Sequence, residues 1–196
     1  MSILLVAGLG NPGRGYARSR HNLGWVVVDA LARKHGLAWR REAAFEAEVA
    51  RWDVGPGVTR WLMKPQTFMN ESGRSVGALA RFRKLETAQV ASVYDDLTLD
   101  VGRLKVTVSG SSGGHNGVAS LLEHLGDGFA RYRLGIGPKR PPEMDLKDFV
   151  LTEFFPEQLV IIEQKLDSFV QGLELLLDRG ADQAMNQLNR KETSTS

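Results

Sequence analysis

ILLVAGLGNPGRGYARSRHNLG, residues 3–24, is the stretch that decides the fold of this chain. Its first five residues are all apolar and are followed by glycine, which is typical of a short strand buried on both faces. Residues 8–13 then contain three glycines and a proline, so the backbone there must turn and come close to another group. The turn presents Asn11, and an irregular segment with Tyr16 and His21 follows it.

The same turn matches the dinucleotide-binding fingerprint G-x-G-x-x-G by its letters. That fingerprint requires a helix that opens at the second or third glycine and an acidic residue about 20 positions later. Pro12 and Gly15 disfavour such a helix, and Asp29 lies inside a segment that itself has a helical pattern. A nucleotide site is therefore the weaker interpretation of the turn.

The composition is that of an ordinary globular protein, with 42% hydrophobic and 24% charged residues and a net charge of +2. A length of 196 residues suits one domain, which we predict over residues 1–190, with a disordered polar tail over 191–196. The chain has no cysteine, which excludes disulfides and cysteine-ligated zinc. The initial apolar run is too short for a signal peptide or a membrane span, so we expect a cytoplasmic protein that contacts no membrane.

Apolar patterns predict alternating strands and helices along the chain. Helices are expected at 23–35, 71–83, 117–125, 156–180 and 181–189, and further strands at 48–53, 58–64, 89–94, 104–108 and 132–137. Gly55-Pro56-Gly57 predicts a hairpin, and a proline-rich loop at 138–142 leads into a charged stretch. The alternation indicates a single α/β domain in which a twisted, mixed and mostly parallel sheet is covered by helices on both faces.

Polar side chains follow several of the predicted strands, and each has a local explanation. Asn11 could make an Asn-Pro-Gly turn, Asn70 and Asn116 could be helix N-caps, and Asp95 could belong to a strand-end turn. Their shared location favours a common site, because ligand sites in open α/β sheets form beyond the carboxyl ends of strands. His21 has no such local explanation, and an imidazole backed by a carboxylate is the usual apparatus for drawing a proton from water.

Two other chemistries are compatible with parts of the sequence. Residues 110–114 satisfy the G-x-S-x-G pattern of a serine nucleophile, and a triad of His21, Asp95 and Ser112 remains open by analogy with other triads. A metal bound by His21, Asp95 and His115 is less favoured, because no pair of these residues has the ligand spacing of a helix.

The candidate residues belong to sequence blocks that follow one another over nearly the whole chain. The blocks are GLGNPG, Tyr16, Arg20-His21-Asn22, Thr67-Phe68-Met69-Asn70, Asp95-Asp96-Leu97, residues 113–117 and residues 133–137. Together they resemble bacterial-type peptidyl-tRNA hydrolase. The resemblance implies hydrolysis of the ester between a peptide and the 3′ end of tRNA, without a metal or another cofactor, by a monomer that needs no obligate protein partner.

Carried over residue by residue, the resemblance implies that His21 is the general base and that Asp95 holds it in its basic form. Asn11 would help to distinguish peptidyl-tRNA from unblocked aminoacyl-tRNA. The other residues that the resemblance assigns to substrate or tRNA binding are Tyr16, Phe68, Met69, Asn70, Asn116, His115, Lys105 and Arg133. The chain departs from the common family pattern at Tyr94, Thr98 and Thr107, and the last of these replaces a second basic residue beside Lys105.

A binding module is the alternative from a different class of function. A relative of this family is a plastid RNA-splicing factor that binds RNA-related partners without evident hydrolysis, so the fold and a basic face could serve that role. Retention of His21 and Asp95 together with three site asparagines, at 11, 70 and 116, favours the enzyme.

Overall fold

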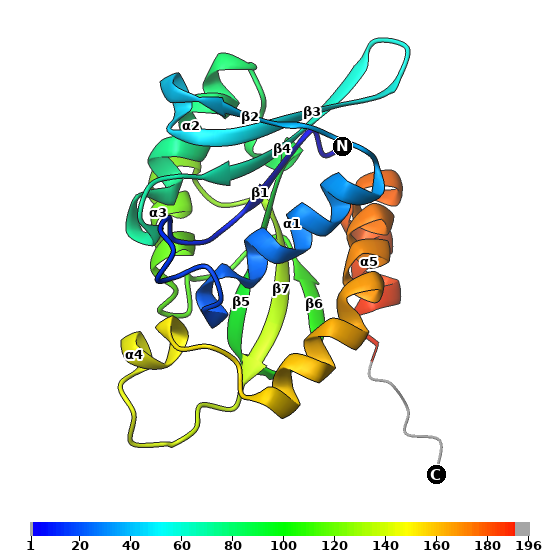
Figure 1. Cartoon of the computed structure of the whole chain (residues 1–196). Coiled ribbons are helices and arrows are strands. Elements are labelled where there is room, and N and C mark those ends of the chain that lie inside the picture. Colours follow the sequence, from blue (N-terminus) through cyan, green and yellow to red (C-terminus); the bar gives the residue numbers. More distant parts are fainter. Residues whose placement is uncertain (1, 191–196) are drawn as a thin grey trace.

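Seven strands form one sheet in this computed structural model, which describes residues 2–190. In the order β2-β3-β4-β1-β5-β7-β6, the strands are Trp39–Glu42, Ala47–Gly55, Val58–Pro65, Leu5–Gly8, Val90–Asp100, Ala130–Gly137 and Leu104–Thr107. The neighbours β4, β1, β5 and β7 pair in parallel, while β3 and β6 run in the opposite direction. The predicted mixed, mostly parallel sheet is therefore confirmed (Figure 1).

Helices cover both faces of this sheet, as predicted. They are α1 (Leu23–Lys34), α2 (Ser72–Phe82), α3 (Asn116–Leu125), α4 (Leu146–Leu151) and α5 (Pro156–Leu188), and the short turns η1 (Arg20–Asn22) and η3 (Met69–Glu71) precede α1 and α2. The buried side chains of α1 and α5 pack on one face of the sheet, and those of α2 and α3 pack on the other (Figure 1). Within residues 2–190, no helix is both long and apolar enough to cross a membrane.

β1 lies at the centre of the sheet because it can be buried on both faces. Leu5 and Ala7 point into the core beneath α2 and α3, whereas Val6 points into the core beneath α1. All three side chains are 0% exposed. Full burial of a large apolar side chain contributes about 1.5–3 kcal/mol, so this apolar run stabilises both layers at once.

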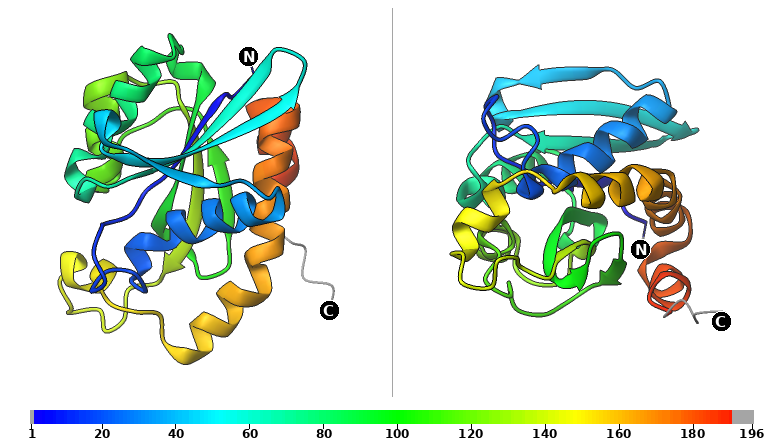
Figure 2. Two further views of the ribbon diagram at one scale, coloured as in Figure 1. Left: turned by 45° about the horizontal axis from the view of Figure 1, so that its top comes forward. Right: turned by 60° about the horizontal axis from the view of Figure 1, so that its bottom comes forward.

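Two elements, β2 and α4, were not predicted. β2 pairs with β3 at the edge of the sheet and leaves most of its side chains exposed, so no apolar alternation indicates it. α4 is a single short helix inside the charged stretch, and Phe149 is its one buried residue. By contrast, the hairpin at Gly55-Pro56-Gly57 is confirmed as β3 and β4, whose tip projects beyond the sheet (Figure 2). The predicted break at Gly180 is also confirmed, because the backbone φ there is +80° inside α5.

The backbones of α2 and α3 come close together at Gly73. Its amide donates to Ser120 Oγ at 2.9 Å, and a Cβ on Gly73 would lie 1.9 Å from the Ser120 carbonyl oxygen. We therefore expect Gly73→Ala to lower the free energy of unfolding by about 3 kcal/mol, because the two helices would have to move apart. Urea denaturation measures this loss.

Gly77→Ala is the matched control on the same helix. A Cβ there would first meet the flexible guanidinium of Arg81 at 3.0 Å, and alanine is the better helix former by about 1 kcal/mol. This variant should be close to neutral. If both alanine variants lose the same stability, the close approach at Gly73 is not what limits the packing of these helices.

Candidate active site

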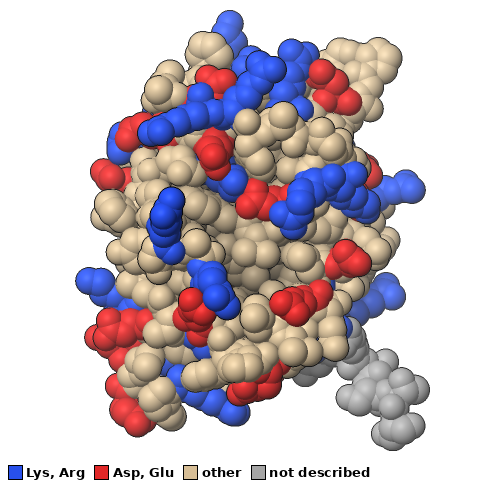
Figure 3. Space-filling model, in the orientation of Figure 1, with Lys and Arg blue, Asp and Glu red and all other residues tan. Residues whose placement is uncertain are grey.

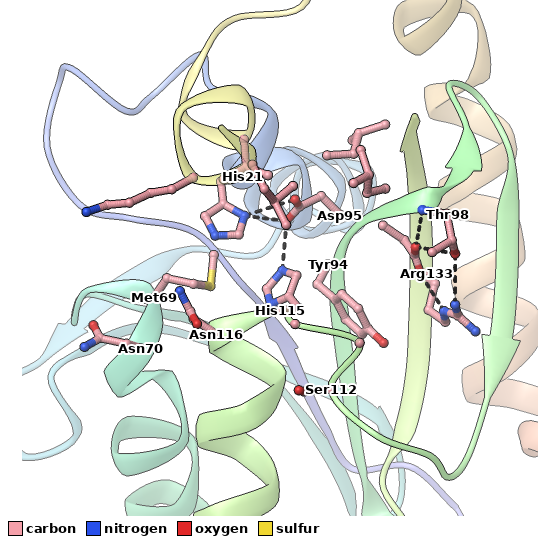
Figure 4. Close-up of a pocket in the computed structure, with 18 of the residues that line it drawn as sticks. His21, Met69, Asn70, Tyr94, Asp95, Thr98, Ser112, His115, Asn116 and Arg133 are labelled. Atoms are coloured by element: carbon pink, nitrogen blue, oxygen red, sulfur yellow. Dashed lines mark hydrogen bonds and ion pairs between the residues drawn. The ribbon is translucent and has the colours of Figure 1, made fainter. Parts of the chain in front are cut away.

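Four segments of the chain meet at the carboxyl edge of the central strands (Figure 4). The turn after β1 carries Asn11, η1 carries His21, β5 carries Asp95, and His115 precedes α3. β1 pairs with β5 only as far as Val93, so Asp95 lies beyond the end of β1 and faces η1. The prediction that Asp95 follows the end of its strand was wrong, because β5 continues to residue 100.

His115 reaches this edge by a route that differs from the sequence prediction. β6 is antiparallel to β7, so Thr107 at its end lies beside Arg131, near the beginning of β7. Residues 108–115 then lead back to Asp95. The site therefore does not take His115 from the carboxyl end of a parallel strand, as the sequence suggested, but from a return loop.

His21 and Asp95 form a buried hydrogen-bonded pair. His21 Nδ1 lies 2.9 Å from Asp95 Oδ1 and 3.0 Å from Oδ2, and the two residues are 7% and 2% exposed. Nδ1 must carry the proton to donate to a carboxylate, which leaves Nε2 of a neutral ring as a proton acceptor. In Figure 4 the ring extends from Asp95 toward Met69 and Asn116.

A second imidazole binds the same carboxylate. His115 Nε2 lies 3.1 Å from Asp95 Oδ1, and His115 Nδ1 accepts from the backbone amides of Gly117 at 3.1 Å and Val118 at 3.3 Å. Because Nδ1 accepts hydrogen bonds, Nε2 must carry the proton that is donated to Asp95. His115 is thus the N-cap of α3, which gives it a structural contact that the family resemblance did not include.

These contacts determine the charge of Asp95. Burial alone would raise the pKa of this carboxyl, but the attraction of His21 and then His115, with hydrogen bonds from both rings, outweighs burial and lowers the pKa well below its ordinary value. A carboxyl whose pKa is lowered on folding stabilises the protein fully above its unfolded value of about 3.9, and that contribution is lost as the pH falls further. Asp95 is therefore a buried anion at neutral pH.

Hydrogen bonds hold Asn11 between two segments of the chain, so it is more than a turn residue. Its backbone amide donates to Asn22 Oδ1 at 2.8 Å, and its own Oδ1 accepts from the amide of Met69 at 2.7 Å. Within residues 2–190, its Nδ2 donates to no protein group. The Asn11 side chain therefore presents a free amide donor to the cavity that it lines.

Asn70 and Asn116 line the same cavity, and both are exposed. The interpretation of these two residues as helix N-caps was wrong, since Glu71 precedes α2 and His115 precedes α3. In the described part of the chain, neither side chain takes part in a hydrogen bond that would prevent it from meeting a ligand.

The cavity has a volume of about 1000 Å³ and is lined by both apolar and polar side chains. Tyr16, Phe68, Met69 and the α4 residues Leu146, Val150 and Leu151 form the apolar part. Phe68 is 56% exposed, and its ring meets that of Tyr16 edge to face at 6.5 Å. The polar part comes from the loop of residues 109–114 and from charged side chains, which include Asp96, Arg131, Arg133, Asp145 and Lys147.

Arg133 and Lys105 are neighbours on adjacent strands, β7 and β6. Arg133 lines the cavity, and its Nε donates to Asp96 Oδ2 at 2.6 Å, whereas Lys105 is exposed and lies outside the cavity lining. On the face seen in Figure 3, basic and acidic side chains are interspersed, in keeping with a net charge of +2. An anionic ligand would therefore depend on locally placed cations such as this pair.

The geometry does not favour the serine triad. Ser112 lines the cavity, but no hydrogen bond joins its side chain to His21 in the described residues, and in Figure 4 it lies on the far side of His115. A metal site is compatible by proximity alone, because the ligand atoms of His21, Asp95 and His115 lie within 4.8 Å of one another. Both rings, however, direct a nitrogen at the carboxylate over hydrogen-bond distances, and a metal would have to replace both contacts.

An imidazole and carboxylate beside free amide donors, at the carboxyl edge of an α/β sheet, define an active site of the hydrolytic type. The chain belongs to the family described as Peptidyl-tRNA hydrolase, whose model matches residues 5–196. The family resemblance inferred from the sequence is thereby confirmed, and the chain is an enzyme of this class.

Relatives of known name and structure agree with this assignment. A peptidyl-tRNA hydrolase of Anaeromyxobacter sp. (strain K) is 45% identical over 188 residues, which cover 95% of this chain and 96% of that protein. One from Gloeobacter violaceus is 41% identical over 192 residues, covering 97% and 96%. The crystal structure of peptidyl-tRNA hydrolase from Acinetobacter baumannii matches with a TM-score of 0.88 at 33% identity, covering 95% of this chain and 94% of that one. None of these names supports the alternative of a pure binding module.

We expect His115→Ala to lower the free energy of unfolding by about 1–3 kcal/mol. The change removes the N-cap of α3 and one hydrogen bond to a buried carboxylate. Urea denaturation measures the loss, and the NMR signal of the His21 Nδ1 proton should shift, because Asp95 loses its second donor.

His124→Ala is the control at the other end of α3. His124 Nδ1 contacts the Ser120 carbonyl oxygen at 2.9 Å and lies outside the site. This change should leave the His21 signal in place. An unchanged signal in His115→Ala as well would contradict the coupling of the two imidazoles through Asp95.

Proposed function

We propose that this protein hydrolyses the ester between the peptide and the 3′-terminal ribose of peptidyl-tRNA, by a metal-free mechanism in which His21 activates water. The released tRNA returns to translation. Family membership supports the substrate. The observation that carries the mechanism is the contact of 2.9 Å between His21 Nδ1 and Asp95 Oδ1, which leaves Nε2 available at a cavity. The proposal includes one domain that acts as a cytoplasmic monomer without an obligate protein partner.

In this mechanism His21 Nε2 takes a proton from water while the water oxygen attacks the ester carbonyl carbon. Asp95 holds the ring in the tautomer that can accept this proton and then stabilises the imidazolium. The proton passes to the ribose oxygen as the ester bond breaks. A positioned general base contributes about 10²–10⁴-fold to the rate, which is sufficient for an activated ester without a covalent nucleophile.

The three asparagines would bind the groups around the reacting carbon. The Nδ2 of Asn11 is free, and its orientation is fixed by Met69 and Asn22. It could donate to a peptide carbonyl but not to the ammonium of an unblocked aminoacyl group, so it would favour the blocked substrate. Asn70 and Asn116 would hold substrate and water, and a single donor to a developing oxyanion is worth about 10²–10³-fold in rate.

The two parts of the cavity lining suit the two parts of this substrate. Arg133 lines the cavity and Lys105 is its neighbour on β6, so the two could meet phosphates of the tRNA acceptor region. Tyr16, Phe68 and Met69 belong to the apolar part of the lining, which suits the peptide side. Thr107 is uncharged, and its partner Arg131 is paired with Asp127, so the proposal places the phosphate contacts at Lys105 and Arg133.

His21→Ala should abolish measurable hydrolysis of N-acetylaminoacyl-tRNA while leaving tRNA affinity within a factor of about two. The ring acts on the water and not on the tRNA phosphates, so catalysis and binding should separate. Release of N-blocked amino acid measures catalysis, and titration of labelled tRNA measures binding. Turnover at the wild-type rate in this variant would overturn the assignment of the base.

The same assay of hydrolysis also tests the two alternative mechanisms, a metal-assisted one and one with a serine nucleophile. Activity should persist in the presence of a chelator and of a serine-directed phosphonate. Inhibition by the chelator, with recovery on adding back a divalent metal, would replace the proposed mechanism by a metal-assisted one. Ser112→Ala should retain activity, because its hydroxyl takes no part in the proposed reaction.

Lys105→Ala should weaken binding to all tRNAs alike. A lysine that neutralises one phosphate releases about one counter-ion, so the slope of log affinity against log salt should fall by about 1. Titrations at several salt concentrations measure the slope, and kcat at saturating substrate should not change. Lys34→Ala, which removes a lysine paired with Glu174, is the control for net charge. An identical loss of slope in both variants would argue against a phosphate contact at Lys105.

A further inference from the structure

Arg20, the residue before His21, is the largest completely buried side chain among the described residues, with 0% exposure. No carboxylate within residues 2–190 forms an ion pair with its guanidinium, and burial lowers the pKa of Arg20. Burial of a charge without a counter-ion is costly, and apolar side chains of similar volume are often more favourable at such positions. The contacts of this cation therefore require an explanation beyond core packing.

The guanidinium makes three hydrogen bonds, two to the connection between α4 and α5 and one to the first turn of α5. Nη1 donates to Thr152 Oγ1 at 2.5 Å and to the Glu153 carbonyl oxygen at 2.5 Å, and Nη2 donates to Gln158 Oε1 at 2.8 Å. The backbone is joined at the same place, because the Arg20 amide donates to the Thr152 carbonyl oxygen at 3.0 Å and Ser19 forms an antiparallel bridge with Glu153. One short segment thus ties η1 to the end of α4.

The guanidinium of Arg20 also packs against the buried side of α4. The guanidinium carbon is 4.3 Å from the ring centre of Phe149, and the rings of Phe154 and Phe155 lie at 5.3 and 5.1 Å. Phe149 is the one buried residue of α4. The cavity that contains His21 is lined by three apolar residues of this helix, Leu146, Val150 and Leu151, and by its Lys147.

α4 cannot hold its own position. Leu146–Leu151 is six residues long, and isolated helices of fewer than about 12 residues are marginal in water. Contacts with the rest of the protein must therefore hold α4 in position. The contacts around Arg20 and Phe149 lie on the buried side of this helix. The neighbour of the general base is therefore also an anchor of the apolar wall opposite that base.

We propose that Arg20 is a positioning residue that sets the separation between His21 and the apolar wall of α4, and that this wall receives the side chain of the amino acid esterified to the tRNA. The inference rests on the proposed function and extends it to substrate selection. It assigns the peptide to Leu146, Val150 and Leu151 because these α4 side chains are apolar, whereas the cations that line the cavity, Lys147 of α4 and Arg131 and Arg133 of β7, suit a polyanion.

Arg20→Lys tests the proposal, because lysine keeps the charge but cannot reach three separate acceptors with a planar fork. We expect KM for N-acetylphenylalanyl-tRNA to rise about tenfold, the effect of one lost hydrogen bond to a charged group, and KM for N-acetylglycyl-tRNA to change less than about twofold. The dependence of kcat on pH should stay as in the wild type, since the contact between His21 and Asp95 is retained. Hydrogen exchange of the amides of residues 146–151 should become faster.

Arg60→Lys is the matched control. Arg60 is another buried arginine, bound to Asp178 Oδ1 at 2.9 Å and to the Leu177 carbonyl oxygen at 2.7 Å, and it lies outside the cavity lining. Arg60→Lys should change neither the ratio of the two KM values nor the rate of hydrogen exchange at the α4 amides. Thr152→Val, which removes one acceptor of Arg20, is the milder variant if Arg20→Lys does not fold, and it should change both readouts in the same direction.

The outcomes separate the two proposals. If the wild-type protein hydrolyses neither substrate, the proposed function fails, and exchange at α4 still decides whether Arg20 anchors the helix. If hydrolysis occurs but Arg20→Lys or Thr152→Val affects both substrates equally and leaves the exchange of α4 unchanged, the positioning role is wrong.

Discussion

The site depends on one buried negative charge. Asp95 is 2% exposed, and an anion so far from water persists only if donors surround it. Two imidazoles supply them, one from the connection between β1 and α1 and one from the start of α3. Because each ring can satisfy Asp95 in only one tautomer, the same charge orders the protons of both histidines. The electrostatics of a single carboxylate thus joins three segments and determines which imidazole nitrogen can act as a base.

The sheet places the Asp95 carboxylate beyond the carboxyl end of β1. β5 continues past the point where β1 ends, so Asp95 emerges from the core while it remains held in a strand. The side chains of β5 enter both hydrophobic cores, as those of β1 do, which limits the movement of the carboxylate. A loop could bring an acid to the same place, but it would hold that acid less rigidly. The catalytic apparatus therefore rests on the most deeply buried part of the fold.

Sequence reasoning succeeded where the signal is local and failed where position is set by tertiary contacts. The apolar run of β1 and the turn at Gly55-Pro56-Gly57 can be recognised from a few adjacent residues. The pairing of His21 with Asp95, in contrast, was expected from chemistry and family resemblance, since no periodicity links residues so far apart. The second ring on Asp95 was missed because β6 is antiparallel, which the residues 104–108 alone do not indicate.

Arg20 and α4 illustrate the same limit. A six-residue helix has too few turns to show an apolar period, and its one buried residue is indistinguishable from an isolated apolar residue in a charged stretch. An arginine in a polar segment is ordinarily assigned to the surface, and only its three hydrogen bonds and aromatic neighbours explain its burial. The roles assigned to the site residues remain predictions that rest on this geometry.

The central position of β1 also has a consequence for biosynthesis. Leu5 pairs with Trp61 on one side and with Val90 on the other, so β1 cannot complete its pairing until both later strands, β4 and β5, have been made. Until then an apolar segment with two open edges is exposed, which is the kind of segment that recruits chaperones or aggregates. Parallel contacts over such sequence separations also slow folding. The interval between the synthesis of β1 and that of β5 is therefore a period in which misassembly can occur.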